Sequence, residues 1–212
     1  MSSELLRIPA DDVQIEGLLE LPAQARGLVL FAHGSGSSRH SPRNLQVARA
    51  LQARETGTLL LDLLTLSENL DYHTRFDITL LTHRLLVATR FVLLHTPASR
   101  RLPIGYFGAS TGAAAALQAA AALGSEVQAV VSRGGRPDLA GRHELAKVLA
   151  PTLLLVGDAD TEVLALNRRA LDQLCCEKEL VLIPGASHLF EEPGALAQVG
   201  QRAADWFGRH WH

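Results

Sequence analysis

Cysteine is nearly absent from this chain. Only Cys175 and Cys176 occur among its 212 residues. Adjacent cysteines rarely form a disulfide with each other, because the bond geometry is strained at that spacing. We therefore expect two free thiols and a reducing, cytoplasmic location. The pair also lacks the spacing of a metal site, so the cysteine content predicts no zinc centre.

An excess of basic residues is also missing. The chain has 20 Lys and Arg against 22 Asp and Glu, which gives a formal net charge of -2. The arginines are scattered rather than clustered. A nucleic-acid-binding domain needs a basic surface to neutralise phosphates. We therefore expect no nucleic-acid partner.

Sequence signals for a membrane are lacking as well. Residues 1–4 show no basic region leading into an apolar core, so we expect no signal peptide. The longest strongly apolar stretch, residues 78–94, contains His83, Arg84 and Arg90. It therefore predicts a buried or amphipathic helix rather than a membrane span, and we expect no membrane partner.

Short, mostly apolar runs are what the chain has in abundance. They cover residues 28–32, 58–61, 103–107, 127–131, 152–156 and 179–183. Helical patterns lie between most of them, at residues 44–55, 79–94, 111–123, 163–174 and 195–209. Continuous apolar strands that alternate with helices indicate a doubly wound, mostly parallel α/β sheet covered on both faces. A chain of 212 residues that is 47% hydrophobic is predicted to form one domain, residues 1–212.

Two further segments refine the predicted architecture. Residues 5–8 and 13–21 flank a turn-like cluster at Ala10, Asp11 and Asp12, which predicts an antiparallel hairpin at the sheet edge. Only about twenty residues separate the strand ending near Ser132 from the next run, a length that fits a loop and a short helix. We therefore expect no sizeable cap domain.

The sequence Gly-Ala-Ser-Thr-Gly at residues 108–112 lies between an apolar run and an alanine-rich helix pattern. At a strand-to-helix turn, such a sequence lifts the serine hydroxyl out of the sheet, and its small neighbours leave the room that this requires. A serine hydroxyl is a poor nucleophile until a base takes its proton and an acid orients that base. Ser110 is therefore a candidate nucleophile that needs two partners.

Candidate partners follow two later strands. Asp158, Asp160 and Glu162 come after the run at residues 152–156, and His188 comes after the run at residues 179–183. Open α/β sheets place their sites at the carboxyl ends of strands, where these residues are expected to meet Ser110. From the residues alone, Asp158 and Glu162 compete with Asp160 as the acid. His33, in the first loop, competes with His188 as the base.

Four motifs occur in the chain order of one known group. They are residues 33–36 (His-Gly-Ser-Gly), 108–112, 157–160 (Gly-Asp-Ala-Asp) and 185–188 (Gly-Ala-Ser-His). With them, the chain from residue 27 to the last helix resembles a small α/β-hydrolase of the dienelactone-hydrolase-like group. The resemblance implies that Ser110 is the nucleophile, Asp160 the orienting acid and His188 the general base, with no cofactor or metal. Dienelactone hydrolases proper use cysteine as the nucleophile, so serine here favours ordinary esters.

A tetrahedral intermediate needs two N–H donors for its oxyanion. We expect one from the backbone of Thr111, at the start of a helix, and one from Ser35, where Gly34 and Gly36 let the backbone turn inward. The same glycine-rich loop could hold a phosphate. It lacks the third glycine of the dinucleotide fingerprint and the lysine of the nucleoside-triphosphate loop, which makes phosphate binding the weaker interpretation.

Two arginines follow another strand. Arg133 or Arg136 is predicted to bind an anionic group of the substrate, because a guanidinium forms two-pronged hydrogen bonds with carboxylate or phosphate. The alternative is a salt bridge with a nearby carboxylate such as Asp138.

The expected function is hydrolysis of small carboxylic esters or thioesters by a serine nucleophile. The same triad could serve an amidase or peptidase, and a relative without activity could act as a binding or assembly module. The loop at residues 63–77 is the expected specificity element. Candidate lining residues are Leu64, Leu66, Phe76, Leu189 and Phe190. The edge hairpin and the helix with Trp206 and Phe207 are candidate surfaces for a homodimer.

Overall fold

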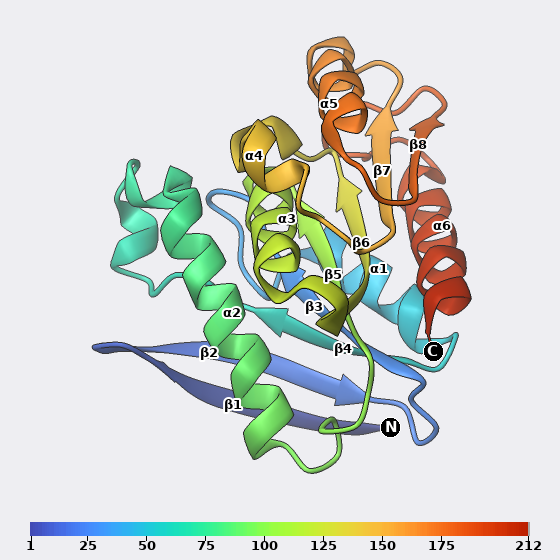
Figure 1. Ribbon diagram of the computed structural model, residues 1–212. Coiled ribbons are helices and arrows are strands. Elements are labelled where there is room, and N and C mark those ends of the chain that lie inside the picture. The colour runs from blue at the N-terminus through green and yellow to red at the C-terminus, as the bar shows by residue number, and fades with distance from the viewer. Residues whose placement is uncertain (212) are drawn as a thin grey trace.

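An eight-stranded sheet forms the centre of the computed structural model, which describes residues 1–211 (Figure 1). The strands are β1 (Ser2–Ala10), β2 (Val13–Leu21), β3 (Gly27–Ala32), β4 (Thr56–Leu61), β5 (Ile104–Ala109), β6 (Val127–Arg133), β7 (Thr152–Gly157) and β8 (Lys178–Ile183). Their order in the sheet is β1-β2-β4-β3-β5-β6-β7-β8. The β1–β2 and β2–β4 pairs are antiparallel, and all later pairs are parallel. The predicted mostly parallel sheet with an N-terminal hairpin is confirmed.

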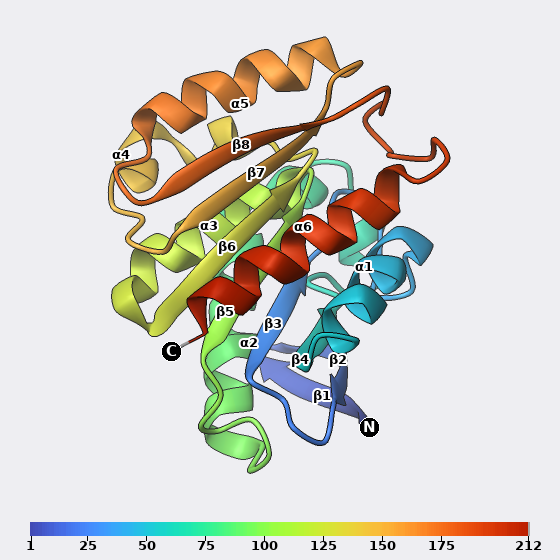
Figure 2. The same ribbon diagram turned by 90° about the vertical axis from the view of Figure 1, so that its right-hand side faces the viewer.

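Helices cover both faces of this sheet. They are α1 (Pro42–Gln52), α2 (Ile78–His95), α3 (Thr111–Leu123), α4 (Arg142–Leu145), α5 (Thr161–Gln173) and α6 (Ala195–His210). Helices α1 and α6 pack together on one face, and α2 and α3 lie side by side on the other (Figure 2). Every residue of β3, β4, β5 and β7 is buried as a result, which explains why these strands read as continuous apolar runs.

Small residues let helix α3 approach the sheet closely. Ala113, Ala114, Ala115 and Ala116 are all completely buried. Helix α3 begins directly after the end of β5, so this close packing fixes where the helix starts. The start of α3 in turn positions Ser110 and Thr111.

Aromatic side chains of helix α6 fill the core on the opposite face. Trp206 and Phe207 are buried, so this pair does not supply the exposed apolar surface that a dimer through it would need. Just beyond the helix, the ring of Trp211 lies against Gly27, where a Cβ would be 2.5 Å from the ring. The C-terminal end of the described chain is thereby fixed beside the first residue of β3. Ser2 lies near the same end of the sheet, paired with Leu21.

Helix α2 is long and apolar enough to cross a membrane by length and composition. Core helices pass the same test, and α2 packs against α3, β1 and β3. It also carries the buried Arg84, which donates hydrogen bonds to the Ala10 carbonyl and to the Glu68 carboxylate. This helix therefore ties the tip of the hairpin to the segment that follows β4.

Short 3-10 helices occupy several of the connections between the strands and helices. Between β6 and β7 lie the 3-10 helix η4 (Pro137–Ala140) and the single turn of α4. Between β4 and α2 lie two 3-10 helices, η1 (Glu68–Leu70) and η2 (Thr74–Phe76). A fourth 3-10 helix, η3 (Gly124–Glu126), precedes β6. As expected, no cap domain is inserted among residues 1–211.

Candidate active site

Ser110 occupies the turn between β5 and α3 with a backbone φ of 50° and ψ of -123°. A positive φ is unfavourable for a residue with a side chain and marks a strained turn. Its flanking glycines are required by close backbone contacts. A Cβ on Gly108 would lie 2.4 Å from the Ala113 Cα, and a Cβ on Gly112 would lie 2.1 Å from the Ala32 carbonyl oxygen. The turn therefore raises Ser110 at the end of the sheet, as predicted for a nucleophile elbow.

The loop after β3 lies directly against this turn. A Cβ on Gly34 would be 2.8 Å from the Ser110 Cβ and 3.2 Å from the Ala109 carbonyl oxygen. Only glycine fits between these groups. The sequence motif indicated that Gly34 lets the backbone turn inward. The structure shows a second reason for glycine at this position, its close approach to Ser110, which the sequence did not reveal.

His188 and Asp160 meet at the ends of β7 and β8. The His188 Nδ1 lies 2.7 Å from the Asp160 Oδ2. A ring that donates through Nδ1 to a carboxylate keeps Nε2 free as a base. The two loops touch because Gly157 has no side chain: a Cβ there would lie 2.1 Å from the Ala186 carbonyl oxygen. The predicted acid and base are thus brought together.

The competing carboxylates are placed differently. The Asp158 Oδ1 accepts a hydrogen bond of 2.7 Å from the Gly185 backbone N–H. Asp158 therefore ties the loop after β8 to the loop after β7. Glu162 lies in the first turn of α5. Of the three candidates, Asp160 is the one whose carboxylate is hydrogen bonded to His188.

His33 is buried, and its ring is engaged by backbone groups on both sides. Its Nδ1 lies 2.9 Å from the Gly34 carbonyl oxygen, which can only accept, so Nδ1 carries a proton. Its Nε2 accepts from the Leu63 backbone N–H at 3.2 Å. This is the neutral ring, and burial lowers the pKa of His33 below its usual value. His33 therefore joins the loop after β3 to the segment after β4.

Ser110 and His188 border the same turn at the end of β6. The Ser110 N–H donates to the Arg133 carbonyl at 3.4 Å, and the Arg136 N–H donates to the Ser110 carbonyl at 2.9 Å. On the other side of the turn, a Cβ on Gly134 would lie 3.7 Å from the His188 Cε1. Among residues 1–211, no hydrogen bond between the Ser110 hydroxyl and the His188 ring is recorded. Such contacts are commonly long before substrate binds.

The expected oxyanion donors lie beside each other. The Ser35 backbone N–H donates to the Thr111 Oγ1 at 3.0 Å. The hydroxyl of Thr111 thus holds the loop after β3 against the start of α3. The sequence placed both residues near Ser110 but gave no signal for this bond between them.

The two arginines have different surroundings. The Arg136 guanidinium forms two hydrogen bonds with Asp138, at 2.9 Å and 2.8 Å, as in the salt-bridge alternative. Arg133 is half-buried, and this burial together with the charge of Arg43 lowers its pKa to about 10. Its Nη1 has no hydrogen-bond partner among residues 1–211, nor has the Nε of Arg43. Sequence reasoning placed Arg43 in a polar loop near the expected oxyanion donors but did not connect it with Arg133, because ninety positions separate the two and no pattern links them.

The residues predicted to line the substrate site differ in their exposure to solvent. Leu64 and Phe190 are buried, whereas Leu66, Phe76 and Leu189 are exposed. The guanidinium of Arg133 lies 6.0 Å from the centre of the Phe190 ring. The Phe190 side chain therefore packs near this arginine and is not exposed to solvent.

Comparison with known proteins identifies the family of this chain over its full length. No protein-family model matches it. The crystal structure of dienelactone hydrolase from Anabaena variabilis matches with 53% sequence identity and a TM-score of 0.94, over 100% of this chain and 99% of that chain. This chain belongs to the dienelactone hydrolase family. Est1E from Butyrivibrio proteoclasticus has the same fold, with 15% identity and a TM-score of 0.82 over 97% of this hydrolase and 98% of that chain.

Curated relatives add a difference in length. Two Mycobacterium tuberculosis proteins, provisionally named phosphoribosyl transferases, are 52% identical to this hydrolase over 210 residues. The match covers 99% of this chain and 47% of each relative. The hydrolase thus spans about half the length of the curated relatives it matches.

Proposed function

We propose that this hydrolase cleaves small carboxylic esters or thioesters with Ser110 as the nucleophile, His188 as the general base and Asp160 as the orienting acid. The observation that carries the proposal is the 2.7 Å contact between His188 Nδ1 and Asp160 Oδ2, across a turn from the strained Ser110. Family membership supports a hydrolase. Serine in place of the family's cysteine favours ordinary esters over dienelactones.

The reaction follows from these positions. The Ser110 Oγ attacks the carbonyl carbon while the His188 Nε2 takes the hydroxyl proton. The backbone N–H of Thr111 donates to the oxyanion, and that of Ser35 turns to it from the Thr111 hydroxyl, to which it donates before substrate binds. The bond to the alcohol or thiol then breaks, and His188 returns the proton to this leaving group. Water repeats the sequence on the acyl-enzyme and releases the acid.

The nucleophile is tested by labelling with a fluorophosphonate and locating the adduct. We expect it on Ser110, and expect Ser110→Ala to abolish labelling and hydrolysis of p-nitrophenyl acetate. An adduct elsewhere would overturn the assignment. Equal rates for wild type and Ser110→Ala would favour a binding or assembly module. Faster cleavage of a p-nitroanilide than of the matching ester would favour an amidase.

The acid is tested by a matched pair of variants. Asp160→Asn should lower kcat far more than Asp158→Asn, because only the Asp160 carboxylate contacts the His188 ring. Loss of a triad carboxylate can cost roughly 10⁴-fold in kcat. A larger loss in Asp158→Asn would reverse the assignment.

We further propose that Arg133 receives an anionic group of the substrate. The Arg133 guanidinium is partly buried, and its Nη1 is shielded from solvent with no hydrogen-bond partner among residues 1–211. Such a charge without a carboxylate partner is unfavourable, so its position beside the nucleophile turn supports a ligand of opposite charge. Arg43 would assist from nearby, because its charge acts on Arg133 and its Nε has no partner among the described residues, although its Nη1 pairs with Glu191 at 3.0 Å. Arg136 is the weaker candidate, since Asp138 already occupies its guanidinium.

This subsite is tested with two esters of similar length, p-nitrophenyl butyrate and mono-p-nitrophenyl succinate. Arg133→Gln should lower kcat/KM for the succinate ester about tenfold or more and leave the butyrate ester nearly unchanged. Arg136→Gln is the control and should leave the ratio of the two kcat/KM values, succinate ester to butyrate ester, unchanged. An unchanged ratio in Arg133→Gln would refute the subsite.

The name of the Mycobacterium tuberculosis relatives refers to a different reaction. Because the matched half has the fold of the Anabaena hydrolase, we infer that the phosphoribosyl transferase name describes the remaining part of those proteins. Phosphoribosyl transfer by the present chain alone would contradict this inference.

A further inference from the structure

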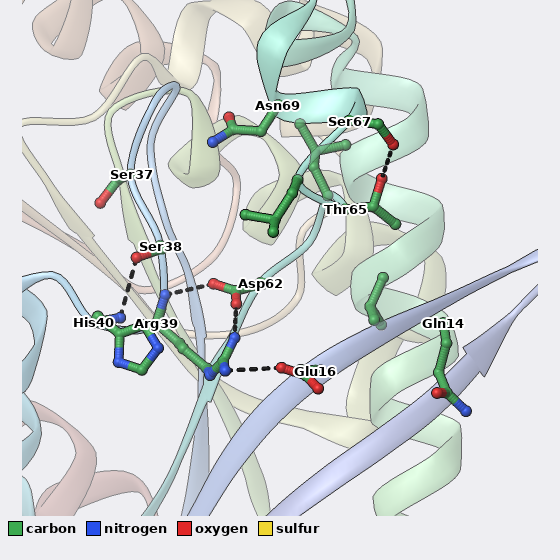
Figure 3. A pocket seen from close by; sticks show the side chains of 13 residues that line it. Gln14, Glu16, Ser37, Ser38, Arg39, His40, Asp62, Thr65, Ser67 and Asn69 are labelled. Carbon is green, nitrogen blue, oxygen red and sulfur yellow. Dashed lines mark hydrogen bonds and ion pairs between the residues drawn. The ribbon is translucent and has the colours of Figure 1, made fainter.

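A cavity of about 730 Å³ lies beside the loop that carries Ser35. Its walls are β2, residues 37–40 and residues 62–69, and Figure 3 shows Arg39 lying between the side chains of Asp62 and Glu16. The volume falls within the roughly 300–1,000 Å³ typical of small-molecule sites. Ser110, Asp160 and His188 are not among its lining residues, so the cavity is additional to the catalytic residues.

The charges at this cavity already neutralise one another in large part. Arg39 lies between two carboxylates: its Nη2 is 2.8 Å from the Glu16 Oε2, and its Nη1 bonds the Asp62 Oδ2. The Arg39 backbone N–H also donates to the Asp62 Oδ1 at 2.6 Å. The other carboxylate oxygen of Glu16 lies 3.8 Å from the Arg7 Nε, so two guanidiniums face two carboxylates. Among the described residues, the charges of Arg7, Glu16, Arg39 and Asp62 are therefore paired with one another. A neutral ligand fits best.

Uncharged polar groups remain to bind such a ligand. Asn69 lines the cavity with a side-chain amide, a group that can donate through Nδ2 and accept through Oδ1. Hydroxyls of Ser37 and Thr65 also line the cavity. The buried side chains of Ile15 and Leu64 contribute apolar surface. Hydroxyl and amide groups around a small apolar surface suit a ring that carries hydroxyls on its edge and C–H groups on its faces.

Both loops of the cavity connect to the nucleophile. Ser37 follows Ser35 by two residues, and Ser35 is bonded to the Thr111 hydroxyl. Asp62 precedes Leu63, whose N–H donates to His33. His33 in turn bonds Gly34, which lies against Ser110. A group bound here would lie next to the loop that is expected to hold the oxyanion.

We propose that this cavity binds a neutral, hydroxyl-rich group of monosaccharide size, carried by the alcohol part of the ester. The role as an alcohol subsite rests on the proposed esterase function. In that reaction the bond between the acyl carbon and the sugar oxygen breaks, and this departing oxygen takes the proton from His188. The acyl group stays on Ser110 until water releases it.

Binding is tested separately from catalysis in the inactive variant Ser110→Ala, by titration with methyl glucopyranoside followed by NMR. Cyclohexanol serves as a ring of similar size with a single hydroxyl. We expect the glycoside to bind more tightly. Adding Asn69→Ala or Ser37→Ala should weaken that binding about tenfold, since each variant removes hydrogen bonds. The exposed residues Gln198 and Ser125 supply matched controls, Gln198→Ala and Ser125→Ala, which should leave binding unchanged.

Turnover tests the assigned role. Wild type should hydrolyse methyl 6-O-acetylglucopyranoside at least tenfold faster in kcat/KM than ethyl acetate, and Asn69→Ala should remove this preference while keeping the ethyl acetate rate. Equal rates on the two esters would refute the alcohol subsite. Glycoside binding that is absent, or that is insensitive to both cavity variants, would overturn the site itself. Failure to hydrolyse any ester would count against the proposed esterase, and the titration would still decide whether the cavity binds the glycoside.

Discussion

Gly34 lies so close to Ser110 that a Cβ on the glycine would be 2.8 Å from the Cβ of the serine. This contact sets the distance between the loop after β3 and the nucleophile turn. A second glycine holds the same two segments together. A Cβ on Gly112, two residues after Ser110, would lie 2.1 Å from the Ala32 carbonyl oxygen and 2.6 Å from that of His33. A small change in one loop must therefore move the other.

Gly34→Ala should lower kcat about 100-fold while the protein stays folded. The added methyl group would displace the loop or Ser110 by the better part of an ångström, and misplacement on that scale can cost roughly 10²-fold in rate. The measurement is hydrolysis of p-nitrophenyl acetate together with circular dichroism. Gly208→Ala is the control, because a Cβ there meets nothing within 4 Å. A rate within threefold of wild type would show that the contact is not required.

Thr111→Val should lower kcat about fivefold. Valine keeps the shape of threonine but cannot accept the hydrogen bond from the Ser35 N–H, and one such bond contributes about 1 kcal/mol. The loop after β3 would then be held less firmly against the start of α3, and we expect the loss of this anchor to outweigh the release of the Ser35 N–H toward the oxyanion. Thr111→Ser, which keeps the hydroxyl, should restore most of the rate. A faster Thr111→Val enzyme would instead mean that the hydroxyl competes with the oxyanion for the Ser35 N–H.

The stability of the protein should fall as the pH drops below about 6.5, in part because of His33. Its pKa is lowered in the folded state, mainly by burial, so the unfolded chain binds a proton at a higher pH than the folded protein does. Stability from the neutral ring is complete above the unfolded pKa and is lost as the pH falls toward the folded value. One such group changes the free energy of unfolding by at most about 1.4 kcal/mol per pH unit.

Urea unfolding at pH 7.5 and 5.5 measures this effect. His33→Gln should be less stable at pH 7.5 and should show a smaller loss between the two pH values than wild type. The exposed His83, paired with Asp11, supplies the control His83→Gln. If His33→Gln keeps the full pH dependence of wild type, His33 does not titrate as inferred.

Glu68→Gln should lower the free energy of unfolding by about 3 kcal/mol. The change leaves the buried Arg84 guanidinium without its carboxylate partner, and breaking a buried ion pair on one side typically costs that much. Asp205→Asn breaks the exposed pair with Arg54 and should cost less than about 1 kcal/mol. Equal effects of the two variants would show that Arg84 finds another partner or water.

The sequence predicted the sheet well because apolar periodicity is a local property. The strand at residues 152–156 was predicted to within one residue of β7, Thr152–Gly157. The N-terminal hairpin was predicted too short, because the first residues of β1 are exposed and polar and thus lack an apolar signal. The 3-10 helices η1 and η2 follow no apolar period, and their segment was predicted only as a loop.

The candidate site shows the same division between local and long-range information. Strand-end motifs brought Ser110, Asp160 and His188 into one proposal, and the contact between the last two was found. The pairing of Ser35 with Thr111 and the proximity of Arg43 to Arg133 depend on how distant elements pack. Pairs separated by 76 and 90 positions leave no periodic pattern in one sequence.

Trp211 and Ser2 both lie at the end of the sheet where the parallel strands begin, whereas Ser110 and His188 follow strand ends at the opposite edge. Affinity tags, fluorescent proteins or surface linkers can therefore be joined at either end of this chain without covering the proposed catalytic residues. The chain can thus be immobilised through either end with Ser110 and His188 facing away from the support.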